Sequence, residues 1–449
     1  MHNGTLINVV TQLAEMLDRR GIAWCVLRNY DTFPRPRSDT SDIDFLLGCK
    51  FGDALFLLET IVTIPVGIGK VIVSRSNDVI SFFLTVPLSP TLHIDFVFGN
   101  LWMGCPLDSS TVLLADRQLI NKVPIPARGH EAANSLTHYL FHRGVVKPEY
   151  RQRISIAATE CRSDFIRCLA PIWGAHLAST IVERAAAADW DWFASWQRIA
   201  KRELLLLACV NPVAAIQTSF GFAANTLRRM MWPPGLWIAF LGPDGCGKTT
   251  VGNAYRTRLS TLFQPQIQRH LHWRPGWLPA PGSLTGSARE SINTTEPHAM
   301  PTHGGFVSFM RFVYFLVDYV IGHWLKVRPL LAKGGLVTFD RYYQDFLIDP
   351  LRYRLRLPVW LLRMAARLVP QPELLFVLNA PADVLHRRKQ ELPLAEIATQ
   401  LDALRRLAAD CPSAHVVRVD RSVDEIVDEL ERVTLDYLNQ RNRRRLGWR

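Results

Sequence analysis

The sequence predicts an α/β protein with two sheet-centred domains, and three observations support this. The length of 449 residues exceeds what one ordinary core accommodates. In the C-terminal half, segments of helix length separate apolar stretches of strand length at residues 237–241, 335–342, 373–379 and 414–420. This alternation is typical of a doubly wound parallel sheet. Near the N-terminus, a helix at 6–19 precedes short strands at 24–27, 41–47 and 93–98, which indicates an α+β domain.

Composition gives broad limits on location and partners. The chain is 48% hydrophobic and 20% charged, as expected for a globular protein. Its net charge of +12 favours anionic partners, but charge alone does not distinguish nucleotides from nucleic acid or an acidic membrane surface. The eight cysteines include no C-x-x-C pair, which argues against a disulfide framework or zinc site. We therefore expect a cytoplasmic protein.

Two apolar stretches, residues 204–224 and 306–325, approach the length of a membrane span. Pro212 interrupts the first, and the second contains Arg311 and Asp318. Charged groups in the middle of a span are costly in lipid. We therefore expect two core helices and no transmembrane segment.

Carboxylates alternate with apolar residues in the strand at 41–47. Asp42 and Asp44 should project from one face, because alternate residues of a strand point the same way. Asp95 lies in a similar apolar setting in the strand at 93–98. Aspartates there cost free energy unless they are paired, hydrogen-bonded or bound to metal. The three predict an oxygen-rich cage suited to Mg²⁺, with exposed aspartates on a half-buried sheet as the alternative.

This pattern resembles the nucleotidyltransferase superfamily of the polymerase-β type over roughly residues 20–100. The resemblance implies that Asp42 and Asp44 bind the metals of a two-metal site and that Asp95 completes it. The family places a Gly-Ser pair before the D-x-D strand, whereas residues 27–30 here are Leu-Arg-Asn-Tyr. Arg28 is an alternative ligand for a phosphate, and nucleotidyl transfer by these aspartates is an alternative function.

The middle of the chain is helical by its apolar spacing, at residues 130–143, 151–170 and 185–208. We therefore extend the N-terminal domain to residue 200. Consecutive prolines stop a helix, so residues 201–235 are expected to be a linker. The second domain then spans 236–440, and the arginine-rich residues 441–449 are expected to form a mobile tail.

The most specific motif follows the strand at 237–241. Residues 242–250 match the pattern G-x-x-x-x-G-K-[ST] of a phosphate-binding P-loop, and the next segment can be helical. Glycines let successive N–H groups turn toward one anion, and the helix start adds its positive dipole end. We expect nucleotide binding by Gly242, Pro243, Asp244, Gly245, Cys246, Gly247, Lys248, Thr249 and Thr250.

With two later stretches, the motif resembles thymidylate kinases and related P-loop nucleoside monophosphate kinases over residues 236–440. Residues 330–342 end in Asp-Arg-Tyr like the family's D-R-Y motif, and residues 371–381 resemble its P-D-L strand. The resemblance implies ATP as donor, Mg²⁺ as cofactor and in-line phosphoryl transfer, in which catalysis consists mostly of positioning and charge stabilisation.

The resemblance also implies roles for individual side chains. Lys248 would neutralise the transferring phosphoryl group, and Asp244 would contact the acceptor. Arg341 would hold the phosphate of the acceptor, while Thr249 and Asp340 would organise Mg²⁺.

Arg387 and Arg388 fall where the family carries a basic lid. Guanidinium groups suit phosphate oxygens, so these two arginines are candidates to close over the phosphates. An exposed basic helix is the alternative interpretation.

The acceptor stays open because the sequence departs from the family's pattern. Trp-Arg-Pro-Gly at residues 273–276 replaces a Glu-Pro-Gly-Gly run, and Asp318 is followed by tyrosine where the family has an Asp-Arg pair. Arg274 is the candidate substitute for the missing guanidinium. We expect as partners a nucleotide and an acceptor such as a nucleoside monophosphate, or another phosphorylated or sugar molecule, and no nucleic acid. A homodimer, and an ATP-binding switch or assembly protein with little turnover, are alternatives.

Overall fold

The computed structural model describes residues 2–28, 30, 33, 42–49, 54, 70–75, 79–85, 92–210, 212–279, 304–388 and 393–445. It divides into two compact units, Met1–Thr226 with Leu438–Arg449 and Leu227–Tyr437. The divisions fall inside helices α9 (Pro212–Met231) and α18 (Val423–Arg445). The expected linker is thus largely helical, and α18 continues to Arg445 where a mobile tail was expected. Basic residues in a last helical turn favour such an extension, because they complement the helix dipole.

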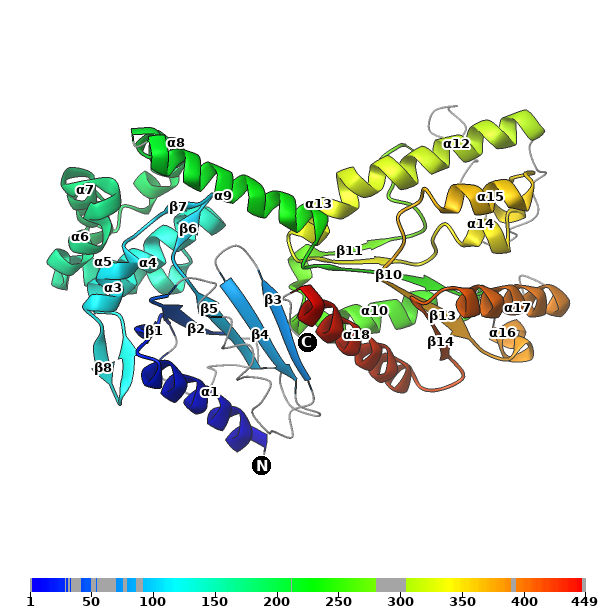
Figure 1. Ribbon diagram of the computed structural model, residues 1–449, viewed down its shortest axis with the longest axis horizontal. Helices are drawn as coiled ribbons and strands as arrows, with labels where there is room; N and C mark the ends of the chain where they lie inside the picture. Colours follow the sequence, from blue (N-terminus) through cyan, green and yellow to red (C-terminus); the bar gives the residue numbers. More distant parts are fainter. Residues whose placement is uncertain are drawn as a thin grey trace. The chain divides into compact units, whose positions relative to one another are not determined.

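The sheet of unit 1 is mixed (Figure 1). Its strands are β1 (Trp24–Val26), β2 (Asp42–Leu47), β3 (Lys70–Arg75), β4 (Val79–Thr85) and β5 (Leu92–Val97), in the order β1-β2-β5-β4-β3. Strands β2 and β5 are parallel, and the other neighbours are antiparallel. Apolar residues of helix α1 (His2–Arg19) pack with Phe45 and Phe96 in its core. Of these strands, the hairpin of β3 and β4 was not predicted from the sequence.

Helices form the second part of unit 1. They are α3 (Ser110–Ala115), α4 (Arg128–His138) with a π-helical turn (Tyr139–Arg143), α5 (Pro148–Glu160), α6 (Arg162–Trp173), α7 (Ala175–Ala186) and α8 (Trp190–Val210). The single helix expected at 151–170 is therefore two helices that meet at Cys161. Two short hairpins precede them, β6 (Leu101–Trp102) with β7 (Cys105–Pro106) and β8 (Gln118–Ile120) with β9 (Val123–Ile125).

A buried carboxylate joins α4 to the segment before α3. Oδ2 of Asp108 accepts hydrogen bonds from the amides of Asn100 (2.6 Å) and Asn134 (3.1 Å) and from the hydroxyl of Thr137 (3.1 Å). Burial raises the pKa of Asp108 to about 6 in spite of these donors. The network replaces the water that this polar group loses on folding.

The sheet of unit 2 is entirely parallel. Its strands are β10 (Leu236–Leu241), β11 (Gln268–Leu271), β12 (Leu336–Phe339), β13 (Leu374–Asn379) and β14 (Ala414–Arg418), in the order β11-β12-β10-β13-β14. The four strands expected from apolar runs are present. Strand β11 was not predicted, because it is a polar edge strand whose residues are half-buried or exposed.

Helices cover both faces of this sheet (Figure 1). They are α10 (Lys248–Arg258), α12 (Gly305–Gly322) continuing through a π-helical turn (His323–Val327) into α13 (Arg328–Ala332), α14 (Asp345–Ile348), α15 (Val359–Ala366), α16 (Ala382–Arg388), α17 (Leu394–Asp410) and α18. On one face, α12, α15 and α17 contribute Phe315, Leu362 and Leu404 to the core. On the other face, Tyr255 of α10 packs on Phe240 and donates or accepts a 2.6 Å hydrogen bond with Thr434 of α18.

The continuous helical stretch Gly305–Ala332 is long and apolar enough, by length and composition alone, to cross a membrane. One side of it belongs to the core of unit 2, where Phe312, Phe315 and Tyr319 are buried. Asp318 on the same side is fully buried and pairs with Arg274 at 2.7 Å. Asp318, one of the two charged residues expected inside this stretch, therefore has a partner within the fold.

Replacing Gly335 with alanine tests how closely the segment before β12 is packed. A Cβ atom at this position would meet the carbonyl oxygens of Ile267 and, at 2.9 Å, of Leu330, so backbone must shift. We expect Gly335→Ala to destabilise unit 2 by about 1–3 kcal/mol, measured by thermal unfolding. The control Gly305→Ala, at a helix start with open space around the new Cβ, should leave the melting temperature nearly unchanged. Equal melting temperatures for the two variants would contradict the packing argument.

Candidate functional site

The segment between β10 and α10 forms a tight turn. Gly245 and Gly247 have φ of 83° and 84°, in the left-handed region that favours glycine. A Cβ at Gly242 would lie 2.6 Å from Sγ of Cys246 and 2.9 Å from the carbonyl oxygen of Leu378. The glycines of the motif therefore occupy positions that other residues fit poorly, and the strand–turn–helix context required of a P-loop is present.

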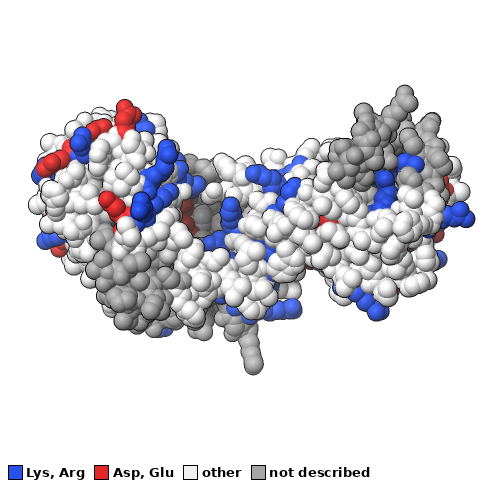
Figure 2. Space-filling model, turned by 90° about the horizontal axis from the view of Figure 1, so that it is seen from above, with Lys and Arg blue, Asp and Glu red and all other residues white. Residues whose placement is uncertain are grey.

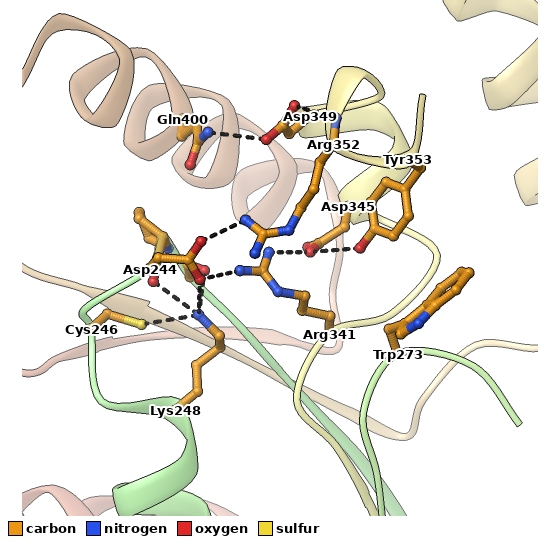
Figure 3. A network of polar contacts seen from close by, with 12 residues as sticks. Asp244, Cys246, Lys248, Trp273, Arg341, Asp345, Asp349, Arg352, Tyr353 and Gln400 are labelled. Atoms are coloured by element: carbon orange, nitrogen blue, oxygen red, sulfur yellow. Dashed lines mark hydrogen bonds and ion pairs between the residues drawn. The ribbon is translucent and has the colours of Figure 1, made fainter. Parts of the chain in front are cut away.

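Lys248 is buried at the start of α10 and turns back onto this loop (Figure 3). Its Nζ donates hydrogen bonds of 2.9 Å to the carbonyl oxygens of Gly242 and Pro243. The same atom lies 3.8 Å from Oδ1 of Asp244 and from Sγ of Cys246. The ammonium group is thus fixed inside the loop, where a bound polyphosphate would meet it.

Asp340 lies beside the loop because β12 pairs directly with β10 in parallel. Its Oδ2 accepts a 2.9 Å hydrogen bond from Oγ1 of Thr249, and Nε2 of His270 lies 3.4 Å from the same oxygen. Its Oδ1 is buried and has no hydrogen-bond partner among the described residues. Although burial opposes ionisation, His270, Thr249 and Lys248 together lower the pKa of Asp340. An ionised carboxylate with an unused oxygen beside a threonine hydroxyl fits a hydrated Mg²⁺ ion.

Asp244 is held by two arginines that approach it from the same side, as Figure 3 shows. Its Oδ1 accepts a hydrogen bond from Nη2 of Arg341, and its Oδ2 accepts one from Nη1 of Arg352 at 2.5 Å. The other side of Arg341 donates to Oδ2 of Asp345 at 2.6 Å, and the hydroxyl of Tyr353 donates to that same oxygen at 3.2 Å. Both guanidinium side chains are only 8% exposed, so the ion pairs are largely shielded from water.

Cations and carboxylates balance in this site. Lys248, Arg341 and Arg352 face Asp244 and Asp345, and the ionised Asp340 also lies near Lys248. Burial alone would raise the pKa of Asp244, but Arg341, Lys248 and Arg352 hold it well below its usual range. The three cations of the site therefore keep Asp244 ionised. The molecular face shown in Figure 2 displays numerous Lys and Arg side chains, in keeping with the net charge of +12.

Two members of this cluster were not predicted from the sequence. Asp345 lies four residues after Arg341, a helical spacing that could have indicated the ion pair. Arg352 begins a short series of alternating arginines, and this pattern matches no functional motif. Its side chain reaches Asp244 from the 3₁₀ turn Leu351–Tyr353.

Arg274, the candidate substitute for a missing guanidinium, has another partner. Its Nη1 donates to Oδ2 of Asp318 at 2.7 Å, and the backbone N–H groups of Gly276 and Leu278 donate to the same carboxylate. This arrangement fastens the loop after β11 to α12. The neighbouring Trp273 is half-buried, and its ring centroid lies 5.1 Å from that of Tyr353.

The expected lid arginines have partners other than the cluster around Asp244. Both are exposed in the last turn of α16. Arg387 pairs with Asp383 of its own helix at 2.6 Å, and Nη1 of Arg388 donates to the carbonyl oxygen of Val419 at 3.1 Å. Their role as a lid stays a prediction.

In unit 1 the three predicted aspartates have different neighbours. Asp44 is buried and accepts hydrogen bonds from Nε (3.1 Å) and Nη2 (2.8 Å) of Arg28. Burial raises the pKa of Asp44 to about 6, with Arg28 acting in the opposite direction. Asp42 and Asp95 instead gather with His93, which was not predicted as a site residue, and the donor atoms of these three lie within 4.8 Å of one another.

A scan of protein-family models and a search of curated proteins found no match. Among solved structures, thymidylate kinase from Ehrlichia chaffeensis matches with a TM-score of 0.32 and 18% sequence identity, covering 45% of this chain and all of that one. The similarity is distant. The chain's own residues must therefore indicate the function.

Replacing Asp244 with asparagine tests the charge balance of the cluster. The neutral amide leaves two buried arginines without their shared carboxylate, so we expect a loss on the order of 3 kcal/mol in stability at pH 7. Because the folded-state pKa is depressed, the carboxylate stabilises fully above its unfolded pKa of about 3.9 and loses this effect as pH falls further. The difference between wild type and Asp244→Asn should stay constant from about pH 8 to pH 5 and shrink below about pH 4.

Chemical denaturation across this pH range measures the difference. The matched control is Asp383→Asn, which breaks the exposed pair with Arg387 and should cost less than about 1 kcal/mol. If the two variants lost equal stability, the ion pairs around Asp244 would not be shielded from water.

Proposed function

We propose that unit 2 is an ATP-dependent phosphotransferase. The observation that carries this proposal is the meeting of the glycine loop, with Lys248 inside it, and the Thr249–Asp340 pair at the carboxyl ends of adjacent parallel strands. Ligands of open α/β sheets bind at this edge. A loop of this kind cradles phosphates with backbone N–H groups, and the hydroxyl–carboxylate pair suits a magnesium ion.

ATP with Mg²⁺ supplies the phosphoryl group and part of the charge neutralisation that transfer requires. The residues of the chain position that group. With ATP bound, Lys248 would donate its hydrogen bonds to phosphate oxygens in place of the carbonyl oxygens of Gly242 and Pro243. Phosphate oxygens are the stronger acceptors because they are charged. Thr249 and Asp340 would hold the cation. The start of α10 adds the positive end of its dipole.

The acceptor in this proposal carries a phosphate. Arg341 and Arg352 both point at Asp244, and a phosphate that replaced this carboxylate would keep both guanidinium groups paired. The motifs of this unit resemble those of nucleoside monophosphate kinases, so a nucleoside monophosphate is the preferred acceptor class. A sugar phosphate is the second class.

Replacing Lys248 with alanine tests the phosphoryl transfer. Removal of one buried charge-stabilising group should lower acceptor-dependent ADP release at least about 100-fold while the chain stays folded. Lys333→Ala removes an exposed lysine of the same unit and should leave turnover unchanged. Normal turnover by Lys248→Ala would rule out the proposed role of the loop.

A screen of ADP release against nucleoside monophosphates and sugar phosphates tests the acceptor. With an active acceptor, Arg352→Gln should raise its KM by about tenfold or more, because a charge-assisted hydrogen bond to the phosphate is lost. The KM for ATP should change little. ATP binding without ADP release for any acceptor would instead favour a nucleotide-dependent switch.

A further inference from the structure

Helix α12 is apolar on both of its sides. The inner side belongs to the core of unit 2, where Phe312, Phe315 and Tyr319 are buried. A second row at helical spacing runs along the outward side into the π-helical turn, and it consists of Phe306, Met310, Val313, Val317, Val320 and Trp324. A helix that is apolar all round normally lies in a protein core or in lipid. The outward row therefore calls for a partner.

This outward row is accessible. The side chains of Phe306, Met310 and Trp324 are 76%, 45% and 44% exposed, and Ile321 and Leu325 beside the row are exposed as well. At 1.5 Å per residue, the row is about 27 Å long. Exposed apolar patches that are this continuous mark sites of contact with another protein or with a membrane.

Helix α15 adds a second exposed apolar row next to the first. Trp360, Met364 and Leu368 follow one another at four-residue intervals and are 64%, 53% and 66% exposed. The two helices pack on the same face of the parallel sheet and share a contact with Tyr343. The ring of Tyr343 lies 6.4 Å from that of Phe312 in α12, and its hydroxyl donates a 2.7 Å hydrogen bond to the carbonyl oxygen of Leu362 in α15.

The charged residues of these two segments are almost all cations. In residues 305–332 and 359–368, Asp318 is the one acidic residue, and it is fully buried against Arg274. The basic residues of the two segments are Arg311, Lys326, Arg328, Arg363 and Arg367, of which Lys326, Arg363 and Arg367 are exposed. Long basic side chains extend along apolar surface and keep their charge at its rim. The outward sides therefore combine apolar and cationic groups without an exposed carboxylate.

This combination distinguishes between two kinds of partner. A second copy of the chain would bring the same cations to the contact, and these helices would offer no carboxylate to pair with them. A membrane that contains anionic lipids supplies both an apolar interior and negative headgroups. Charge complementarity therefore favours the membrane.

We propose that the outward sides of α12 and α15 dock unit 2 on the surface of a membrane that carries anionic lipids. The helices lie on this surface and do not cross it, because the inner side of α12 forms part of the core and Asp318 is paired within the fold. Phe306 and Met310 enter the boundary between headgroups and acyl chains. Trp324 and Trp360 suit the level of the headgroups, where amphipathic rings gather.

Sedimentation of the full-length chain with lipid vesicles tests this proposal. We expect binding to vesicles of phosphatidylcholine with about 30% phosphatidylserine to be at least about tenfold stronger than binding to phosphatidylcholine alone. Phe306→Glu should weaken binding to the anionic vesicles at least about tenfold, because it places a charge in the apolar row. The matched control Leu394→Glu alters an exposed leucine at the start of α17 and should bind like the wild type.

Further variants separate the contributions of the two helices and of charge. Trp360→Glu should weaken vesicle binding as Phe306→Glu does, and it replaces that variant if Phe306→Glu fails to fold. Arg363→Glu should weaken binding to the anionic vesicles only. Arg432→Glu, which reverses an exposed charge on α18 of the same unit, should change binding little.

Three results would overturn the proposal. They are the absence of binding to anionic vesicles, equal binding to both kinds of vesicle, and binding that neither Phe306→Glu nor Trp360→Glu weakens. Light scattering without lipid tests the other partner, since a dimer that Phe306→Glu dissociates, together with no vesicle binding, would assign this surface to a second copy of the chain. These readouts do not depend on phosphoryl transfer, so they stand or fall separately from the proposed function.

Discussion

The parallel pairing of β10 with β12 is the constraint on which the site of unit 2 depends. It brings two chain segments about 90 residues apart to one edge of the sheet, so that Thr249 bonds to Asp340 and Asp244 meets Arg341. Strand β10 is buried along its whole length, as is β12, which fixes their register through apolar packing on both faces. The polar chemistry at their ends therefore has a rigid apolar support.

Much of this arrangement could be predicted from local sequence. The glycines around Lys248 specify a turn that other residues fit poorly, and the long apolar runs specify buried strands. Residues further along the chain were harder to place. Arg352 reaches Asp244 through tertiary folding of a 3₁₀ turn, and no periodic pattern marks such a contact. Strand β11 was not predicted because an edge strand needs no apolar run.

In unit 1 even fewer of the side-chain contacts could be predicted from the sequence. The alternation of Asp42 and Asp44 correctly indicates that they share a strand, and Asp95 lies on the neighbouring strand. The partners of each carboxylate depend on which side chains the fold brings opposite them. Arg28 pairs with Asp44, and His93 joins the other two through the register of β2 and β5. The two-residue spacing of His93 and Asp95 places both on one face of their strand, but spacing does not determine the register that brings Asp42 opposite His93, so that contact could only come from the structure.

If Arg341 and Arg352 hold the phosphate of the acceptor as proposed, their pairing with Asp244 has a consequence for selectivity. An incoming molecule does not meet two unoccupied guanidinium groups, because the chain already supplies an internal anion to both. A ligand can take the place of that carboxylate without a net loss of binding free energy only if it offers at least as much negative charge in the same forked geometry. Discrimination against neutral molecules would then arise from competition with the protein itself rather than from steric exclusion.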